Sequence, residues 1–366
     1  MGWLSEWDYR KSINISRATG AVTDYQLKLL VGESSGATGE DVDCGGKCLS
    51  NFNDLRFTAA DGTTLLDYWI ETISGTTPNQ LATVWIKFNT IGTSDTTFYM
   101  YYGNASAAAY SNGTNTFIIF DDFERGSDGD TVGGDWTDTT AGAAPPLIST
   151  AQKYGGTRSA KIYSYADGFP LPGGMETAVT ASDNISIMFR IYKNPNGEPV
   201  FSHGDGSSLQ VIAWQNGGRL YYRDSSWNEV ELAPSPAVSS EEWHLFEFNN
   251  FNWATNSFDL LIDEVIIGSG LVGPASTGEN NKFIFNSQNY NPGTNITWID
   301  NFIVRNYRTT EPAWGSWGSE ENKPPNTSEE IPIVQTYEAT SETPSSFVAN
   351  GEVTSSGSIS ERGFWY

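Results

Sequence analysis

The feature that most constrains this chain is a long series of short runs in which apolar and polar residues alternate, each ended by residues that favour turns. In the first part of the chain these runs include YRKSINIS, DYQLKLLV, ATVWIKF and TTFYMYYGN. A period of two places every second side chain on the same face of a β-strand. The dipeptide Asp61-Gly62, between two such runs, is a strong hairpin signal. The pattern therefore predicts an all-β protein.

The composition points to the same fold class. Aromatic residues make up 13% of the 366 residues, and charged residues only 17%. Aromatic and β-branched side chains suit a half-buried pleated surface, whereas the Ala-, Leu-, Glu- and Lys-rich runs of long helices are missing. A chain of this length has room for two or three domains, each with its own core.

The net charge of −24 argues against two classes of partner, nucleic acids and anionic lipid. So acidic a surface repels phosphate backbones, which argues against nucleic-acid binding, and it disfavours adhesion to anionic lipid. No apolar stretch is long enough to span a membrane, so no membrane insertion is expected. The start, MGWLSEWDYR, lacks the regions of a signal peptide. We expect a segment of a longer secreted or cell-surface protein, or a virion protein.

Four segments are predicted from the spacing of strands and turns. Residues 1–112 are expected to form a β-sandwich, and residues 113–310, with the same pattern over a longer span, a two-sheet jelly roll. Residues 311–331 are rich in Pro, Glu and Ser without periodicity, which is typical of a linker. Residues 332–366 resume the strand pattern, but an Ig-like sandwich needs roughly 100 residues. We therefore predict an incomplete Ig- or fibronectin-like module there.

Six of the seven tryptophans outside the second segment lead to separate expectations. Those of the first segment are expected to pack in its core: Trp3, Trp7, Trp69 and Trp85. Trp314 and Trp317 lie inside the expected linker, in EPAWGSWGSE. They are expected either to dock against the preceding domain or to anchor a partner.

The first segment resembles a known domain family. The stretches WDYRKSINI, TDYQLKLLV, DLRFTAADGTTLLDYWIE and TTFYMYYGN, spread over residues 3–104, resemble a family of unknown function found in large surface and secreted proteins of bacteria and archaea. The resemblance implies a β-sandwich module and attaches no activity to it.

The later segments carry two further resemblances. FIIFDDFE, EEWHLFEFN, NSFDLLIDEVIIG and WIDNFIVRNY resemble the concanavalin A-like lectin/glucanase superfamily, in its laminin-G-like branch. VANGEVTSSGSISERGFWY is similar to the Ig- or fibronectin-like repeats of adhesins. The resemblances imply a concanavalin A-like jelly roll followed by the start of an Ig-like module.

Acidic residues interrupt two apolar runs of the second segment, FIIFDDFE and WIDNFIV. In a jelly roll of the kind resembled, the first and last strands pair, which would bring the two runs together. Calcium takes six to eight oxygen ligands, and a cation relieves repulsion between gathered carboxylates. A structural calcium site is therefore predicted at Asp122 and Asp300, with Asn301 or Glu124 assisting. The alternative is that these acids are simply solvated at strand ends.

A cluster of aromatic residues is the candidate for sugar binding. Pyranose rings stack on flat aromatic side chains while polar neighbours bond the hydroxyls. The stretch AWQNGGRLYYRDSSW predicts a hairpin, and FSHGDGSS a nearby loop. The predicted ligand-binding residues are Trp214, Tyr221, Tyr222, Trp227, His203 and Asp205. Core packing is the alternative, and of the neighbours Tyr221 and Tyr222 only one can face outwards.

Catalysis has less support in the sequence. Retaining glycosidases need two carboxyl groups about 5–5.5 Å apart, and no ExDxE-like pattern occurs. Glu229 and Glu231 are the nearest approach, two residues apart beside Trp227. With two histidines in all, His203 and His244, a Ser–His–Asp or zinc site has little material. We expect no enzyme activity.

The two cysteines, Cys44 and Cys48, stand in CGGKC. They are interpreted either as a disulfide that closes a Gly-rich loop, which an extracellular setting would favour, or as two free thiols.

The sequence thus predicts a non-enzymatic carbohydrate-binding or adhesive segment of a large extracellular, cell-surface or virion protein. Glycans or glycosylated surfaces are the expected partners, and calcium the expected structural cofactor. A structural spacer or fibre subunit that self-assembles is the alternative, and a glycoside hydrolase is the third.

Overall fold

A computed structural model describes most of the chain. The described residues are 2–17, 19–37, 39–140, 144–163, 174–179, 183–195, 197–203, 212–214, 219–232, 239–253, 255–274, 282–288, 296–325, 333–343 and 346–354. The backbone alone is described for residues 203, 212–214, 288 and 333–354. The chain divides into two compact units, Met1–Glu320 and Glu321–Tyr366.

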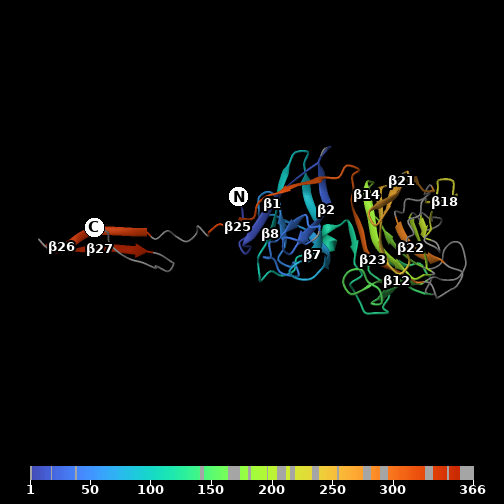
Figure 1. Cartoon of the computed structure of the whole chain (residues 1–366), viewed down its shortest axis with the longest axis horizontal. Coiled ribbons are helices and arrows are strands. Elements are labelled where there is room, and N and C mark those ends of the chain that lie inside the picture. Colours follow the sequence, from blue (N-terminus) through green and yellow to red (C-terminus); the bar gives the residue numbers. More distant parts are fainter. Residues whose placement is uncertain are drawn as a thin grey trace. The chain divides into compact units, whose positions relative to one another are not determined.

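The first unit contains two β-sandwiches (Figure 1). The strands of the first sandwich are β1 Tyr9–Ser16, β2 Val22–Gly32, β3 Val42–Asp43, β4 Arg56–Thr58, β5 Leu65–Leu66, β6 Tyr68–Ser74, β7 Leu81–Ile91, β8 Thr96–Tyr102 and β24 Ala313–Trp317. One sheet has the order β24-β1-β8-β4-β5, and the other β3-β2-β7-β6. Alternation selects the core: on β7, Val84, Ile86 and Phe88 are buried between the sheets.

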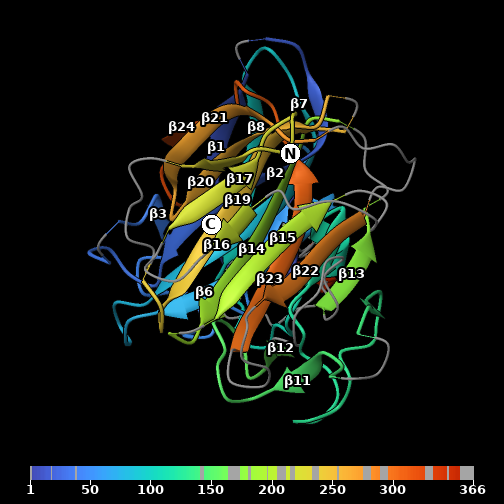
Figure 2. The same ribbon diagram turned by 90° about the vertical axis from the view of Figure 1, so that its right-hand side faces the viewer.

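The second sandwich is built from the strands between β8 and β24. Its strands are β9 Ile119–Asp121, β10 Thr137–Asp138, β11 Leu147–Ser149, β12 Ser159–Tyr163, β13 Gly174–Ala178, β14 Ile185–Lys193, β15 Glu198–His203, β16 Ile212–Trp214, β17 Leu220–Arg223, β18 Glu229–Glu231, β19 Trp243–Asn252, β20 Ser257–Ile262, β21 Val265–Val272, β22 Lys282–Gln288 and β23 Ile296–Asn306. One sheet has the order β11-β12-β23-β14-β19-β20-β21, with β9 beside β23. The other has the order β10-β13-β22-β15-β16-β17-β18, and Figure 2 looks towards the faces of these sheets.

Aromatic side chains fill the core of the second sandwich. Phe189 of β14 lies at the centre, with its ring centroid 4.7 Å from that of Phe285 and 5.8 Å from that of Phe246. Edge-to-face and offset contacts of this kind add to the free energy gained from burial. The predicted all-β fold class is confirmed by these sheets: the described residues contain a single short helix, α1 (Gly113–Thr116).

Strand β24 shows that part of the expected linker belongs to the first sandwich. It pairs antiparallel with β1, with Ile13 opposite Trp317 and Ile15 opposite Trp314. Between these pairs two residues of β24 face a single residue of β1, and this bulge puts two tryptophans that are three residues apart on the same face. The period of two is lost at that point, which is why the sequence pattern did not predict a strand over residues 313–317.

Both tryptophans of β24 dock on the first core, as one of the two sequence expectations had it. Trp314 meets Phe88 with ring centroids 5.7 Å apart, and its Nε1–H donates to the Lys28 carbonyl oxygen at 3.0 Å. Trp317 stacks on Trp314. Because β24 follows β23 in the chain, the whole second sandwich is inserted between two strands of the first.

The two sandwiches meet face to face. The outer face of the β3-β2-β7-β6 sheet packs on the outer face of the sheet that contains β14, β19 and β23. The buried cluster between them consists of Trp69, Trp85, Phe117, Met188, Leu245 and Ile303. Trp69 and Trp85 therefore do not lie in the first core, as the sequence had suggested, but between the sandwiches.

The two cysteines of the first sandwich flank a turn. Cys44 is fully buried in the core, and burial raises the pKa of its thiol. The Cys48 thiol lies next to it and adds to this rise in the pKa of Cys44, and its Sγ is also 3.8 Å from the Glu33 carbonyl oxygen. Gly45 and Gly46 both have positive φ angles and form the turn between them. The two sulfurs are not joined in this structure, and both interpretations, a disulfide and two free thiols, stay predictions.

The second unit contains β25 Glu321–Asn322 and an antiparallel pair, β26 Ile333–Thr343 with β27 Ser346–Thr354. A two-stranded sheet by itself is only marginally stable in water. Its assignment to an Ig- or fibronectin-like module stays a prediction. In the part of the chain that the structure describes, no helix is long and apolar enough to cross a membrane.

Replacing Trp314 by alanine should destabilise the first unit. The substitution removes the ring that packs on Phe88 and the hydrogen bond to Lys28, so the free energy of unfolding should fall by about 2–3 kcal/mol. Urea denaturation followed by tryptophan fluorescence measures the loss. Trp227→Ala, at a side chain that is 40% exposed, is the matched control and should cost less than about 1 kcal/mol. Equal losses would contradict the role assigned to β24.

Candidate functional site

Pairing of the first and last strands brings the two acidic runs together, as predicted. β9 runs antiparallel to β23, with Asp121 opposite Phe302 and Phe120 opposite Ile303. Asp300 lies on β23 two residues before this pair, and Glu124 follows β9. The sequence therefore located the right strand ends, and the question is what the carboxylates contact there.

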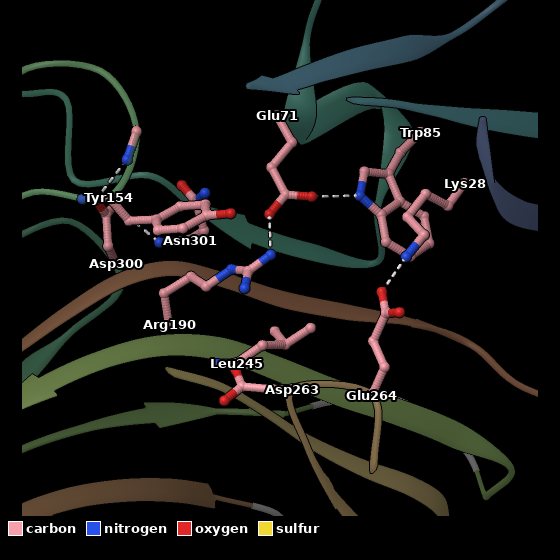
Figure 3. A network of polar contacts seen from close by, with 11 residues as sticks. Lys28, Glu71, Trp85, Tyr154, Arg190, Leu245, Asp263, Glu264, Asp300 and Asn301 are labelled. Carbon is pink, nitrogen blue, oxygen red and sulfur yellow. Dashed lines mark hydrogen bonds and ion pairs between the residues drawn. The ribbon is translucent and has the colours of Figure 1, made fainter. Parts of the chain in front are cut away.

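Asp300 is completely buried and holds a neighbouring loop. Its Oδ2 accepts hydrogen bonds from the backbone N–H groups of Tyr154 (2.8 Å) and Gly155 (3.2 Å). Its Oδ1 accepts from the N–H of Asn301 at 2.9 Å. Figure 3 shows this carboxylate beneath the Tyr154 segment. Asp300 is thus not the solvated strand end of the alternative interpretation.

Glu124 holds the same loop from its other end. Its carboxylate accepts from the N–H groups of Thr157 (2.6 Å) and Arg158 (2.7 Å), and from the Thr157 hydroxyl at 2.7 Å. Although burial acts against it, these hydrogen bonds leave the pKa of Glu124 below its ordinary value. The segment Tyr154–Arg158 is therefore fixed by two acids, a function that the sequence did not indicate.

Asp121 and Asp122 differ in their surroundings. Asp121 accepts from Arg125 Nη1 and from Trp136 Nε1, each at 2.7 Å. Asp122 accepts from the N–H of Glu124 at 3.2 Å, and burial, with Asp121 and Glu124 nearby, raises its pKa. Asp121, which is not among the predicted metal ligands, is thus engaged by an arginine and a tryptophan.

These contacts bear on the predicted calcium site. Most carboxylate oxygens of Asp300 and Glu124 already accept from backbone N–H groups. Within the described ranges, no three His, Cys, Asp or Glu side chains are grouped so that they could hold a metal ion. The acids therefore do not form a ready coordination shell, and their contacts are those of loop anchors. Calcium binding at Asp122 and Asp300, with Asn301 or Glu124, stays a prediction.

The anchored loop also reaches the first sandwich. The Tyr154 ring lies over the Arg190 guanidinium, with its centroid 4.1 Å from Cζ. Arg190 in turn pairs with Glu71 of β6 at 2.9 Å. Asp300 thus supports a chain of contacts that ends on the other sandwich (Figure 3).

The predicted aromatic hairpin exists and presents one tyrosine outwards. Leu220 and Tyr222 of β17 pack against the core of the second sandwich. Tyr221 and Arg223 therefore face away from it. β17 pairs with β18, with Tyr221 opposite Glu231.

The turn between β17 and β18 displays Trp227. Asp224 fixes this turn because its Oδ1 accepts from the N–H groups of Ser226 (2.8 Å) and Asn228 (2.9 Å). Trp227 has a positive φ of 66° and leaves 40% of its side chain exposed. Tyr221 and Trp227 are thus placed on one hairpin at the edge of the sheet. Asp205 and the side chains of His203 and Trp214 lie outside the described part of the chain.

Each of the two acids considered for catalysis, Glu229 and Glu231, lies close to an arginine. Glu229 and Glu231 are exposed on β18. Arg223 Nη2 lies 3.3 Å from Glu229, and Arg219 Nε lies 3.9 Å from Glu231. The pairs supply both donors and acceptors beside Tyr221. They also show the acids engaged with cations rather than placed together in a cleft.

A Ser–His–Asp arrangement that the sequence did not indicate lies at the start of β19. His244 Nε2 is 3.2 Å from the Ser239 Oγ, and its Nδ1 is 2.7 Å from the Asp263 Oδ2. The same Nε2 is also 3.2 Å from the Ser239 carbonyl oxygen, and Asp263 accepts from the N–H of Leu245. We interpret these contacts as fixing the turn after β20 against β19.

Asp300 should make stability depend on pH. Burial raises its pKa to about 7, even though its three backbone donors act in the opposite direction. The unfolded value is about 3.9. Because the folded pKa is the higher one, the stabilising contribution is complete below about pH 4 and is lost as the pH rises through 7. Asp300→Asn should remove about 2–3 kcal/mol of the pH dependence between pH 5 and pH 8.

Urea unfolding at pH 5, 6, 7 and 8 measures this effect. Asp95→Asn, at an exposed residue of the first sandwich, is the control and should leave the profile of the unmodified protein unchanged. A steep profile that persists in Asp300→Asn would show that another group is responsible.

Calcium should raise the unfolding temperature of the protein if the predicted site exists. A ligand at 100 times its dissociation constant adds about 2.7 kcal/mol when it binds only the folded state. The measurement compares calcium with excess chelator, in the unmodified chain and in Asp122→Asn plus Asp300→Asn. A rise that the double substitution abolishes supports the site. An identical midpoint in calcium and chelator leaves the acids as loop anchors alone.

Comparison with known proteins bears most directly on the family resemblance predicted for the first segment. A family described as a domain of unknown function, DUF2341, matches residues 51–139. The match overlaps the resemblance over residues 3–104 and supports an N-terminal unit of unknown function. No curated protein matches the sequence. The lectin-like and Ig-like assignments of the later segments stay predictions.

Several solved structures are similar to about half of the chain. The cellulose induced protein Cip1 is 17% identical, with a TM-score of 0.40, over 53% of this chain and 99% of that one. An endo-β-1,4-glucuronan lyase from the fungus Trichoderma reesei is 14% identical, with a TM-score of 0.37, over 53% and 98%. The CBM22-1 xylan-binding domain of Paenibacillus barcinonensis Xyn10C is 13% identical, with a TM-score of 0.29, over 52% and 93%. Likenesses this distant assign no activity to the chain.

Proposed function

We propose that the chain is a non-enzymatic carbohydrate-binding segment whose binding surface is the β17–β18 hairpin of the second sandwich. The observation that supports it best is the outward position of Tyr221 on β17 together with the exposed Trp227 in the turn between β17 and β18. An exposed large aromatic residue on a rigid turn offers a flat apolar surface at little entropic cost. The sheet beneath it is rigid because its inner face packs against the phenylalanine core.

Polar groups around the two rings suit sugar hydroxyls. Arg219 and Glu231 flank Tyr221, and Arg223 and Glu229 lie next along the hairpin. Guanidinium groups donate only, and carboxylates accept only, so together they can bond hydroxyls in either direction. A pyranose has an apolar face and a polar rim, and this arrangement offers partners for both.

The proposed setting is extracellular, at a cell or virion surface, with glycans or glycosylated proteins as partners and an adhesive role. A net charge of −24 keeps the chain soluble and away from anionic surfaces. Structural calcium at Asp122 and Asp300 is part of this proposal.

A fibre or spacer subunit is the second candidate, and one observation favours it. β21 is an edge strand of its sheet, and Val265 and Ile266 on it are 60% and 64% exposed. Exposed apolar edge strands favour pairing with another chain. Sedimentation across a range of concentrations tests the fibre role, because a fibre subunit should self-associate through this edge and a monomer at all concentrations contradicts it.

Removing either ring of the hairpin should weaken glycan binding. Tyr221→Ala and Trp227→Ala should each lower affinity about five- to tenfold, because stacking on an aromatic face contributes about 1–1.5 kcal/mol. A glycan array identifies the ligand, and calorimetry then measures the affinities. Tyr163→Ala, on β12 of the other sheet, is the matched control and should bind normally. Binding that survives both substitutions would place the site elsewhere.

A further inference from the structure

A cleft of about 540 Å³ opens between the two sandwiches, beside the apolar cluster that joins them. Ligand sites commonly measure 300–1,000 Å³ and occur preferentially where domains meet. β2, β6 and β7 of the first sandwich form one wall, and β14, β19 and β23 of the second form the other. Figure 3 looks into this region, with Glu71 and Trp85 above Arg190 and Leu245.

Strand alternation explains why polar groups face this cleft. On β19, Phe246 and Phe248 fill the core of the second sandwich. Leu245, Glu247 and Asn249 therefore point the opposite way and line the cleft.

The cations of the cleft each have a carboxylate partner. Arg190 pairs with Glu71 at 2.9 Å, and Arg305 pairs with Glu311 at 2.8 Å. Lys28 pairs with Glu264 across the entrance.

One acid that lines the cleft, Glu247, has no such cationic partner among the described residues. Glu247 is 8% exposed, and among the described residues its carboxylate has no hydrogen bond or ion pair. An ionised carboxylate that is buried without a partner is unfavourable. Burial accordingly raises the pKa of Glu247, and the cations nearby only partly offset this. The cleft therefore has one negative charge more than its side chains neutralise.

We propose that this cleft binds a small ligand that carries a protonated amine, with the ammonium group paired to Glu247. An ammonium carries one positive charge and three N–H donors. It therefore supplies the counter-charge and the hydrogen bonds that the Glu247 carboxylate does not find among its neighbours. A bare divalent ion fits less well, because it needs several free oxygen ligands and Glu247 is the one carboxylate lining the cleft, among the described residues, that is not already paired. Trp85 and Leu245 provide an apolar surface for the body of the ligand.

An amino sugar and a lysine-like amine share this chemistry. The cleft has room for a sugar ring, so glucosamine is the first probe and lysine the second. The site is separate from the β17–β18 hairpin, and the proposal does not depend on carbohydrate binding there. Tyr221→Ala should accordingly leave amine binding intact.

The test uses the full chain and measures the unfolding temperature and calorimetric binding at pH 7. Glucosamine should bind and raise the midpoint, whereas glucose, which has no amine, should do neither. Glu247→Gln keeps the shape and removes the charge, so binding should fall at least tenfold. Glu6→Gln, at an exposed residue of the first sandwich, should bind like the unmodified protein. If lysine binds as well as glucosamine, the ammonium is the feature recognised; if glucosamine is preferred, the ring contributes as well.

Two further readouts keep the proposal open to refutation. Without ligand, Glu247→Gln should unfold at a higher temperature, because it removes a buried unpaired charge. Thr83→Arg places a guanidinium in the same cleft and should abolish binding even though the protein folds. Unchanged binding in either variant, binding of glucose equal to that of glucosamine, or no binding of either amine overturns the proposal.

Discussion

Contact between two sheets of different sandwiches is the interaction on which the first unit depends. Trp69 and Trp85 from one side and Met188, Leu245 and Ile303 from the other exclude water from the centre of this contact. Such burial is favourable in proportion to the apolar area removed from water. Around the centre the same strands carry charged residues on the same face. The residues of this one face therefore form both the buried apolar cluster and the polar cleft beside it. The interface therefore fixes the geometry of every group in the cleft.

The fold class could be predicted because alternation is a local property. A strand such as β7 shows in its own letters which residues face inwards. The order of strands in a sheet is not a local property. The return of β24 to the first sandwich could not be predicted, because a bulge hides the alternation of β24 and its partner strand lies some 300 residues earlier in the chain. For the same reason Trp69 and Trp85 were assigned to the wrong apolar layer: alternation separates two faces of a strand without saying what covers each.

The candidate site was predictable to a similar extent. The pairing of β9 with β23 followed from the family resemblance, and period two left Tyr221 or Tyr222 as the outward residue. What the acids contact was not predictable, because Asp300 and Glu124 bond the backbone of a loop that the sequence does not connect to them. The isolation of Glu247 is also a property of the folded state, since it follows from where three distant cations find their partners.

The insertion of the second sandwich has a mechanical consequence. β1 and β24 are antiparallel neighbours, so the chain enters and leaves the first sandwich at the same edge. Tension applied at those two points would act on this strand pair and would peel it apart one hydrogen bond at a time. Until the pair opens, the inserted sandwich lies outside the path of the force. A surface that holds a ligand could in this way stay unstrained while the chain around it is pulled.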